Sequence, residues 1–187
     1  MVAGDRLDFQ LFVLKRMIGG DEQIDAALAE LGVTRAEMRD VGERVSAGLD
    51  LRQGTMTLAN VKKLAGEPDG EERCWTNGES GTALFYHFPM WPEFDFKVVG
   101  RDGDGLWIDD GFVRCENSEV PHVESPESLQ PWKHLVDEVR ERFGPLQEGD
   151  MWPPYEQYET ERRDADGVLR RHIFQFSWGL LQRASVH

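Results

Sequence analysis

The runs of residues that resemble catalytic or metal-binding motifs fit turns better than functional sites. Gly78-Glu-Ser80-Gly81 places a serine near glycines, but it lacks the Gly-x-Ser-x-Gly spacing of a nucleophile elbow and lies between two predicted strands. Asp102-Gly-Asp104-Gly105 begins like a calcium loop, yet Leu106 stands at its fifth position and no glutamate stands at its twelfth. We therefore predict a hairpin turn at each place.

The cysteines and histidines do not form a metal motif either. Cys74 and Cys115 are far apart, and the five histidines lack the short paired spacing of zinc ligands. We expect two buried structural thiols, no metal and no cofactor. With a turn centred on Glu79, Cys74 would face Leu84, and His87 would project from the opposite face of the sheet, which disfavours a Cys–His nucleophile pair.

Two tryptophans lie in proline-containing loops, Pro89-Met90-Trp91-Pro92 and Met151-Trp152-Pro153-Pro154. Proline restricts the backbone, so the adjacent tryptophan could be presented to a partner with little loss of entropy, as in a binding hot spot. Alternatively, both side chains cover the open end of a sheet as core residues, because tryptophan is usually well buried. The sequence leaves both arrangements open.

Charge is the most distinctive global property of the chain. The net charge is −14 over 187 residues, and residues 51–128 hold 7 basic and 15 acidic side chains. An acidic surface repels phosphate backbones and favours basic protein partners, although solubility alone also explains it. We therefore expect a basic protein partner and no nucleic acid. We expect no membrane either, because no apolar run approaches the roughly 20 residues that span a bilayer.

Composition indicates a globular protein. Hydrophobic residues make up 40% of the chain, enough for a core in one or two small domains. The first residues show no basic region followed by an apolar stretch, so no secretory signal is predicted. Two cysteines are too few for a disulfide framework, and we expect a reduced, cytoplasmic setting.

Residues 1–50 predict a short helical segment. Helical spacing runs over 7–17 and 21–31, and Thr34 with Glu37 forms a capping box for a third helix that reaches about Gly48. Residues 29–38 resemble the turn of a helix-turn-helix. However, residues 35–44 mix three arginines with three acidic residues, which gives no positive face for DNA. A structural helical module is the preferred interpretation.

Residues 51–117 predict a helix followed by a four-stranded antiparallel meander. Thr57 can cap a helix over 58–65, and apolar residues then alternate with polar ones in strand-like runs. Phe94, Phe96 and Val98 share one face of such a run. The strands are expected at 72–76, 82–88, 93–99 and 106–116, with turns at 77–81 and 101–105.

Residues 118–130 predict a linker, and residues 131–187 predict a second helix with antiparallel strands. The helix is expected at 131–143 and strands at 155–163, 168–178 and about 180–186, with a turn at 164–167. Both predicted helices place a valine five residues before a glycine, with a proline soon after. Because Gly66 and Gly144 could each form a left-handed cap, the second unit is interpreted as a degenerate repeat of the first.

One motif resembles that of a known family. Gly54-Thr-Met-Thr57 precedes Val61, Leu64, Gly66 and Pro68, and then Trp75 and Phe85-Tyr86. This order resembles the Gly-Met-Thr, Val, Leu-Gly-x-Pro, Trp and Tyr pattern of the SmpA/OmlA lipoprotein family, whose fold the tandem-repeat β-lactamase inhibitor proteins share. The resemblance covers residues 52–116, with a faint echo in 131–187. It implies a helix-plus-sheet module whose concave sheet and loops bind other proteins.

The sequence thus predicts an α+β protein with a short helical N-terminal segment and two helix-on-antiparallel-sheet units. The preferred function is a non-enzymatic, acidic protein-binding module, such as an inhibitor or immunity-type protein that occludes a basic partner. The alternatives are a small-molecule or peptide binder that uses an aromatic-lined concave sheet, and a carboxylate-dependent hydrolase with Asp109 and Asp110 beside His87. The expected binding surface combines rigid aromatic and acidic side chains: Trp91, Asp102, Asp104, Asp109, Asp110 and Trp152.

Overall fold

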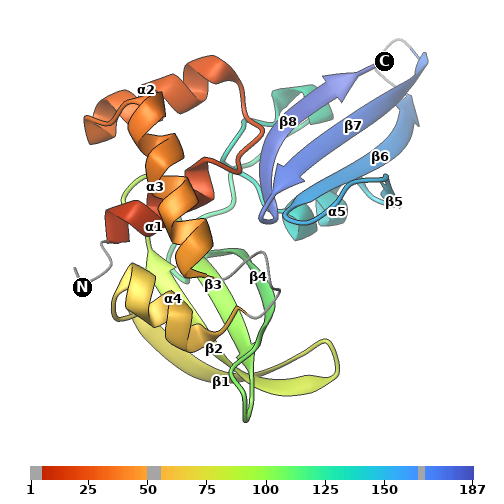
Figure 1. Ribbon diagram of the computed structural model, residues 1–187. Helices are drawn as coiled ribbons and strands as arrows, with labels where there is room; N and C mark the ends of the chain where they lie inside the picture. The colour runs from red at the N-terminus through yellow and green to blue at the C-terminus, as the bar shows by residue number, and fades with distance from the viewer. Residues whose placement is uncertain (1–5, 50–55, 164–166) are drawn as a thin grey trace. The chain divides into compact units, whose positions relative to one another are not determined.

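A computed structural model describes residues 6–49, 56–163 and 167–187. These residues form five α-helices and two four-stranded antiparallel sheets, which confirms the α+β class (Figure 1). The chain divides into two compact units: unit 1 comprises residues 1–16 and 21–113, and unit 2 comprises residues 17–20 and 114–187. None of the helices in the described part of the chain is long and apolar enough to cross a membrane.

Three helices form the N-terminal region, as the sequence predicts. They are α1 (Arg6–Leu14), α2 (Asp21–Leu31) and α3 (Arg35–Gly48). The capping box before α3 is present: Glu37 N donates to Thr34 Oγ1 at 3.2 Å, and Thr34 N donates to Glu37 Oε2 at 2.8 Å. These two bonds satisfy backbone donors that would otherwise lack a partner at the helix start.

The first sheet follows one capped helix. Thr57 Oγ1 accepts a hydrogen bond from Asn60 N at 3.3 Å, so α4 begins where the sequence places it. The sheet is a meander in the order β1-β2-β3-β4 (Figure 1). Its elements are α4 (Leu58–Ala65), β1 (Gly70–Thr76), β2 (Glu79–His87), β3 (Phe94–Arg101) and β4 (Trp107–Arg114).

The β1–β2 hairpin turns at Asn77 and Gly78, whose φ angles are 52° and 80°. A two-residue turn with both φ angles positive suits Asn-Gly, and it pairs Cys74 with Gly81. The predicted five-residue turn centred on Glu79, with Cys74 opposite Leu84, is therefore wrong. The shorter turn shifts the register by three residues.

The core of unit 1 joins the N-terminal segment to the sheet. The Phe9 ring of α1 lies 5.8 Å from the Tyr86 ring, 6.2 Å from the Phe88 ring and 6.0 Å from the Phe96 ring. The predicted alternation in β3 is present, because Phe94, Phe96 and Val98 are buried while Asp95 and Lys97 between them are partly exposed. Helix α1 thus docks on the aromatic face of the sheet.

Unit 2 contains a second helix and a second meander, in the order β5-β6-β7-β8. Strands β6 and β8 have the bounds expected from the sequence, whereas the short edge strand β5 was not predicted. The elements are a 3₁₀ turn (Pro126–Ser128), α5 (Val136–Phe143), β5 (Gln147–Glu148), β6 (Tyr155–Arg163), β7 (Leu169–Ser177) and β8 (Leu180–Val186).

Helix α5 supplies one wall of the core of unit 2. Val139 and Phe143 pack with Phe174 and Phe176 of β7, and Leu129 belongs to the same buried cluster. The segment 118–130, predicted to be a linker, therefore contributes an apolar side chain to this core.

Helix α5 begins at Val136 and not at residue 131. Residues 132–136 bond to the start of β8 instead: Trp132 N donates to Leu181 O at 2.7 Å, and Leu181 N donates to His134 O at 2.8 Å. The predicted helix over 131–143 is therefore too long at its start. Sheet-like hydrogen bonds replace the expected first turn of the helix.

The two helix ends differ in detail. Gly66 adopts φ 80° after α4, whereas Gly144 after α5 has φ −65° and ψ 166°. The prediction of a left-handed cap at Gly144 is thus wrong. A Cβ at Gly144 would lie 2.4 Å from Arg140 O, so close packing explains this glycine. Both units nevertheless share the element order of one helix followed by four antiparallel strands.

Two parts of the predicted motifs lie outside the described residues. They are Gly54 and Thr55 of the family-like motif and residues 164–166 of the turn between β6 and β7. The boundary expected between residues 50 and 51 also lies there.

Candidate protein-binding surface

Trp152 is the most exposed large apolar side chain that the structure describes, with 83% of its surface in contact with solvent. Its loop is nevertheless held by backbone hydrogen bonds on either side of Pro153. Tyr155 N donates to Trp152 O at 2.9 Å, and Trp178 N donates to Pro154 O at 2.8 Å. An apolar side chain is therefore presented to solvent from an ordered backbone, which is the first of the two arrangements that the sequence leaves open.

The neighbourhood of Trp152 along the chain is acidic. Residues 148–156 include Glu148, Asp150 and Glu156 and contain no basic side chain. Glu148 and Asp150 are exposed, while Glu156 accepts a hydrogen bond from Tyr158 Oη at 2.9 Å. Burial, together with that bond to a carboxylate, raises the pKa of Tyr158 to about 12. The loop thus combines an exposed aromatic residue with acidic side chains and has no basic side chain within residues 148–156.

The Trp91 side chain, unlike that of Trp152, is buried. Its exposed fraction is only 2%, and its ring lies 4.9 Å from the Phe112 ring and 6.1 Å from the Phe88 ring. Two backbone bonds, Trp91 N to Phe88 O and Phe94 N to Trp91 O, hold the loop in a tight turn at 2.9 Å each. Trp91 is therefore a core residue of unit 1, and its side chain is not available to a partner.

Two of the predicted surface aspartates lie near the turn between β3 and β4. Asp102 accepts a hydrogen bond from Arg73 Nη2. Asp104 accepts one from Arg101 Nη2 at 2.7 Å and one from Leu106 N at 3.0 Å. These bonds, with Arg101 as the largest cause, lower the pKa of Asp104 to about 2. Both carboxylates have arginine partners inside unit 1.

The two aspartates of β4 are also engaged within unit 1. Asp109 Oδ2 lies 3.1 Å from Lys97 Nζ and accepts a hydrogen bond from Thr76 Oγ1 at 3.3 Å. Asp110 Oδ2 accepts a hydrogen bond from Trp107 Nε1 at 2.6 Å. All four predicted aspartates thus have donors within unit 1, whereas Trp152 belongs to unit 2.

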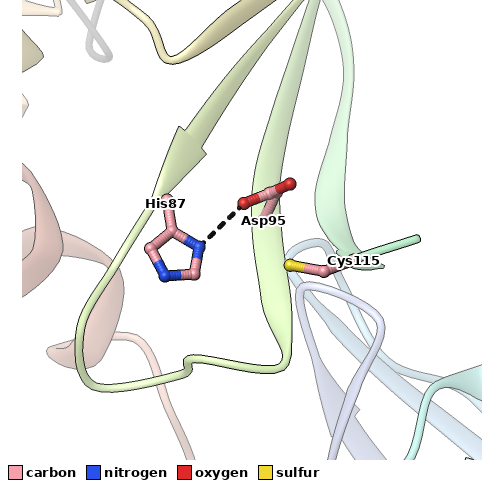
Figure 2. Close-up of side chains that lie close together, drawn as sticks. All are labelled: His87, Asp95 and Cys115. Carbon is pink, nitrogen blue, oxygen red and sulfur yellow. Dashed lines mark hydrogen bonds and ion pairs between the residues drawn. The ribbon is translucent and has the colours of Figure 1, made fainter. Parts of the chain in front are cut away.

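His87 pairs with Asp95 of the neighbouring strand, as Figure 2 shows. Its Nδ1 lies 3.0 Å from Asp95 Oδ1, and its backbone N donates to Asp69 Oδ2 at 2.7 Å. The histidine of the hypothetical hydrolase site therefore has Asp95 as its carboxylate partner, and not Asp109 or Asp110.

Cys74 and Cys115 form no disulfide and are both partly exposed, so the expectation of buried thiols is wrong. Cys74 belongs to strand β1 of unit 1. Cys115, which is also labelled in Figure 2, belongs to unit 2.

Two features were not recognised as candidate sites from the sequence. Trp75 on β1 is 73% exposed. In the sequence it stands out only as part of the family-like motif. In unit 2, a cavity of about 380 Å³ lies beside α5 and includes the buried His134 in its lining. No sequence signal points to this cavity, because its residues come from segments that become neighbours only on folding.

The detectable similarity of this chain to known proteins is low. No family model and no curated protein matches the chain, so the resemblance to the SmpA/OmlA pattern stays a prediction. A solved structure from Streptococcus mutans, provisionally named a beta-lactamase inhibitor protein, is similar at a TM-score of 0.28 and 12% identity. The match covers 70% of this chain and 82% of that one. A similarity of this size does not establish a shared fold or function.

Proposed function

We propose that this chain is a protein-binding module of the inhibitor or immunity type, which binds a basic partner through the loop around Trp152. The observation that carries the proposal is the exposed Trp152 side chain on a backbone held by hydrogen bonds. Tryptophan is enriched among binding hot spots because it buries a large area and loses few rotamers.

The held loop lowers the cost of binding. Tyr155 N and Trp178 N already bond to the loop carbonyls, so little backbone entropy remains to be lost when a partner covers Trp152. An indole in a partner's pocket would then contribute mainly by slowing dissociation.

Charge selects the class of partner. The chain has a net charge of −14, and Glu148 and Asp150 beside the loop are exposed. Negative charge around an apolar centre favours a partner whose binding face is basic and accelerates its association. The internally paired aspartates of unit 1 are less suited to this role, since Arg73, Arg101 and Lys97 already contact three of them.

The two alternative functions have less support. Binding of a small molecule on the aromatic face of the first sheet is opposed by Phe9, which fills that face together with Tyr86 and Phe96. A carboxylate-dependent hydrolase would need His87 beside Asp109 or Asp110, but His87 pairs with Asp95.

The test is a capture experiment with the full chain immobilised and a lysate of the source organism. We expect wild-type protein and the Trp75→Ala variant to retain the same basic protein, which high salt releases. The Trp152→Ala variant should lose most of it. Equal retention by both variants, or retention of no basic protein by the wild type, would contradict the proposal.

A further inference from the structure

The cavity of unit 2 offers a mainly apolar wall. It lies between α5 and the segment around Val123, and its volume is about 380 Å³. Leu129, Val139 and Phe143 line it and also belong to the buried apolar cluster of unit 2. A ligand in this cavity would therefore rest directly on the core of the unit, with apolar atoms as its main contacts.

One buried polar side chain in the cavity wall has a ring nitrogen without a hydrogen-bond partner among the described residues. His134 is 2% exposed, and its Nε2 makes no hydrogen bond within the part of the chain that the structure describes. The backbone at His134 is fixed, because His134 O accepts a hydrogen bond from Leu181 N at 2.8 Å. A buried nitrogen without a partner is costly, and Nε2 has almost no accessible surface, so a ligand hydroxyl that meets it as the ring turns toward the cavity would gain one hydrogen bond.

The buried charge beside the cavity is already compensated. Both oxygens of Glu138 are occupied: Oε1 by Arg114 Nε at 2.6 Å, and Oε2 by Arg114 Nη2 and Leu135 N, each at 2.9 Å. The remaining ionisable lining residues, His122, Glu141 and Arg142, are exposed to solvent. The deep part of the site thus presents no unbalanced charge to a ligand.

The protonation state of His134 agrees with this conclusion. Burial, the largest cause, lowers the pKa of His134, which keeps the imidazole neutral near pH 7. A neutral imidazole offers one donor and one acceptor and has no preference for an anion.

The volume sets the size of the ligand. An apolar cavity of roughly 150 Å³ holds one benzene ring. A cavity of about 380 Å³ therefore has room for two fused rings. It also falls within the roughly 300 to 1,000 Å³ of known small-molecule sites.

We propose that this cavity binds an uncharged aromatic molecule of about two rings that carries a hydroxyl group, with the rings on Val139 and Phe143 and the hydroxyl on His134. The site is independent of the protein-binding loop around Trp152, and it would give the module a second, small-molecule ligand.

The test measures binding of three probes to the full chain by calorimetry: 2-naphthol, naphthalene and 2-naphthoate. We expect saturable binding of 2-naphthol that is about 2- to 10-fold tighter than that of naphthalene, the value of one net hydrogen bond. The anionic 2-naphthoate should bind more weakly than 2-naphthol, since the apolar wall cannot solvate its carboxylate. No saturable binding of 2-naphthol, or equal affinities for 2-naphthol and naphthalene, would overturn the proposal.

Variants locate the site. His134→Phe should abolish the preference for 2-naphthol over naphthalene, and His134→Gln should restore part of it. Trp152→Ala is the matched control and should leave the 2-naphthol affinity unchanged, which separates this site from the protein-binding loop. A preference that survives in His134→Phe would overturn the proposal. If that variant does not fold, the order of the three probes on the wild type still decides.

Discussion

Arg114 Nε lies 2.6 Å from Glu138 Oε1, and Arg114 Nη2 lies 2.9 Å from Glu138 Oε2. The two side chains, both in unit 2, are only 11% and 15% exposed. Removing one partner of a nearly buried pair leaves the other charge without compensation. We therefore expect Glu138→Ala to lower the free energy of unfolding by about 3 kcal/mol or more in urea denaturation.

The control for the Arg114–Glu138 ion pair is the neighbouring ion pair between Asp137 and Arg140, which is exposed to solvent. Asp137 lies 2.5 Å from Arg140 at the surface of the same helix, so Asp137→Ala should cost less than about 1 kcal/mol. A loss below 1 kcal/mol in Glu138→Ala would show that the buried pair does not stabilise unit 2.

Phe9 makes the N-terminal segment part of the core of unit 1. Because its fully buried ring contacts Tyr86, Phe88 and Phe96, Phe9→Ala should destabilise the protein by about 3 to 5 kcal/mol. Trp75→Ala removes an exposed aromatic ring and should change the free energy of unfolding by less than about 0.5 kcal/mol. Chemical denaturation of both variants checks this, and equal small losses would mean that α1 does not support the sheet.

Local signals explain why much of the fold was predictable. Thr34 with Glu37 and Thr57 before Leu58 specify helix starts through side-chain caps, which depend only on neighbouring residues. Strands β6 and β8 were likewise readable from alternation. The Asn77-Gly78 pair is likewise a local signal, typical of a two-residue hairpin turn.

The features that decide the candidate sites were not local. Trp91 and Trp152 have nearly identical proline settings, and only the tertiary contacts of Trp91 with Phe88 and Phe112 separate the buried from the exposed side chain. The start of α5 depends in the same way on bonds to β8, and the cavity around His134 depends on the docking of residues 120–129. Such pairings between distant segments leave no pattern in a single sequence.

Stability should depend on pH through His134. Burial lowers its pKa in the folded state below the usual value of 6.5, so the unfolded state binds the proton more readily. The contribution of the neutral His134 to the free energy of unfolding is therefore fully present above about pH 6.5. It is lost as the pH falls through the lower pKa of the folded state. For the wild type, the urea concentration at the midpoint of unfolding should thus decrease as the pH is lowered below about 6.5. In His134→Phe this decrease should be smaller. An identical pH profile for both proteins would contradict a buried neutral imidazole.

Helix α3 should not bind DNA. Its Arg35 lies 2.5 Å from Asp25, and its Arg44 lies 3.0 Å from Asp8, so two of its three arginines are neutralised by acidic neighbours. At physiological salt we expect the dissociation constant for any duplex to be no lower than roughly 10⁻⁴ M, which is typical of non-specific binding. Fluorescence anisotropy with a labelled duplex checks this, and a salt-sensitive micromolar complex would restore the helix-turn-helix interpretation.

Association kinetics should report the acidic surroundings of the loop. Asp150→Asn removes an exposed charge two residues before Trp152 and should slow association with the captured basic partner and weaken its salt dependence. Its dissociation rate should stay near that of the wild type. Surface plasmon resonance at several salt concentrations separates the two rates, and an unchanged association rate would place the charge recognition elsewhere.

The dissociation rate of the captured partner from Trp152→Ala tests the protein-binding proposal most directly. A hot-spot tryptophan contributes about 2 kcal/mol or more, so dissociation should be about 30-fold faster than from the wild type. Trp75→Ala, which removes the other highly exposed tryptophan, should keep the wild-type rate. Circular dichroism must first show that both variants are folded. A wild-type dissociation rate in Trp152→Ala would contradict the proposal that this loop binds the partner.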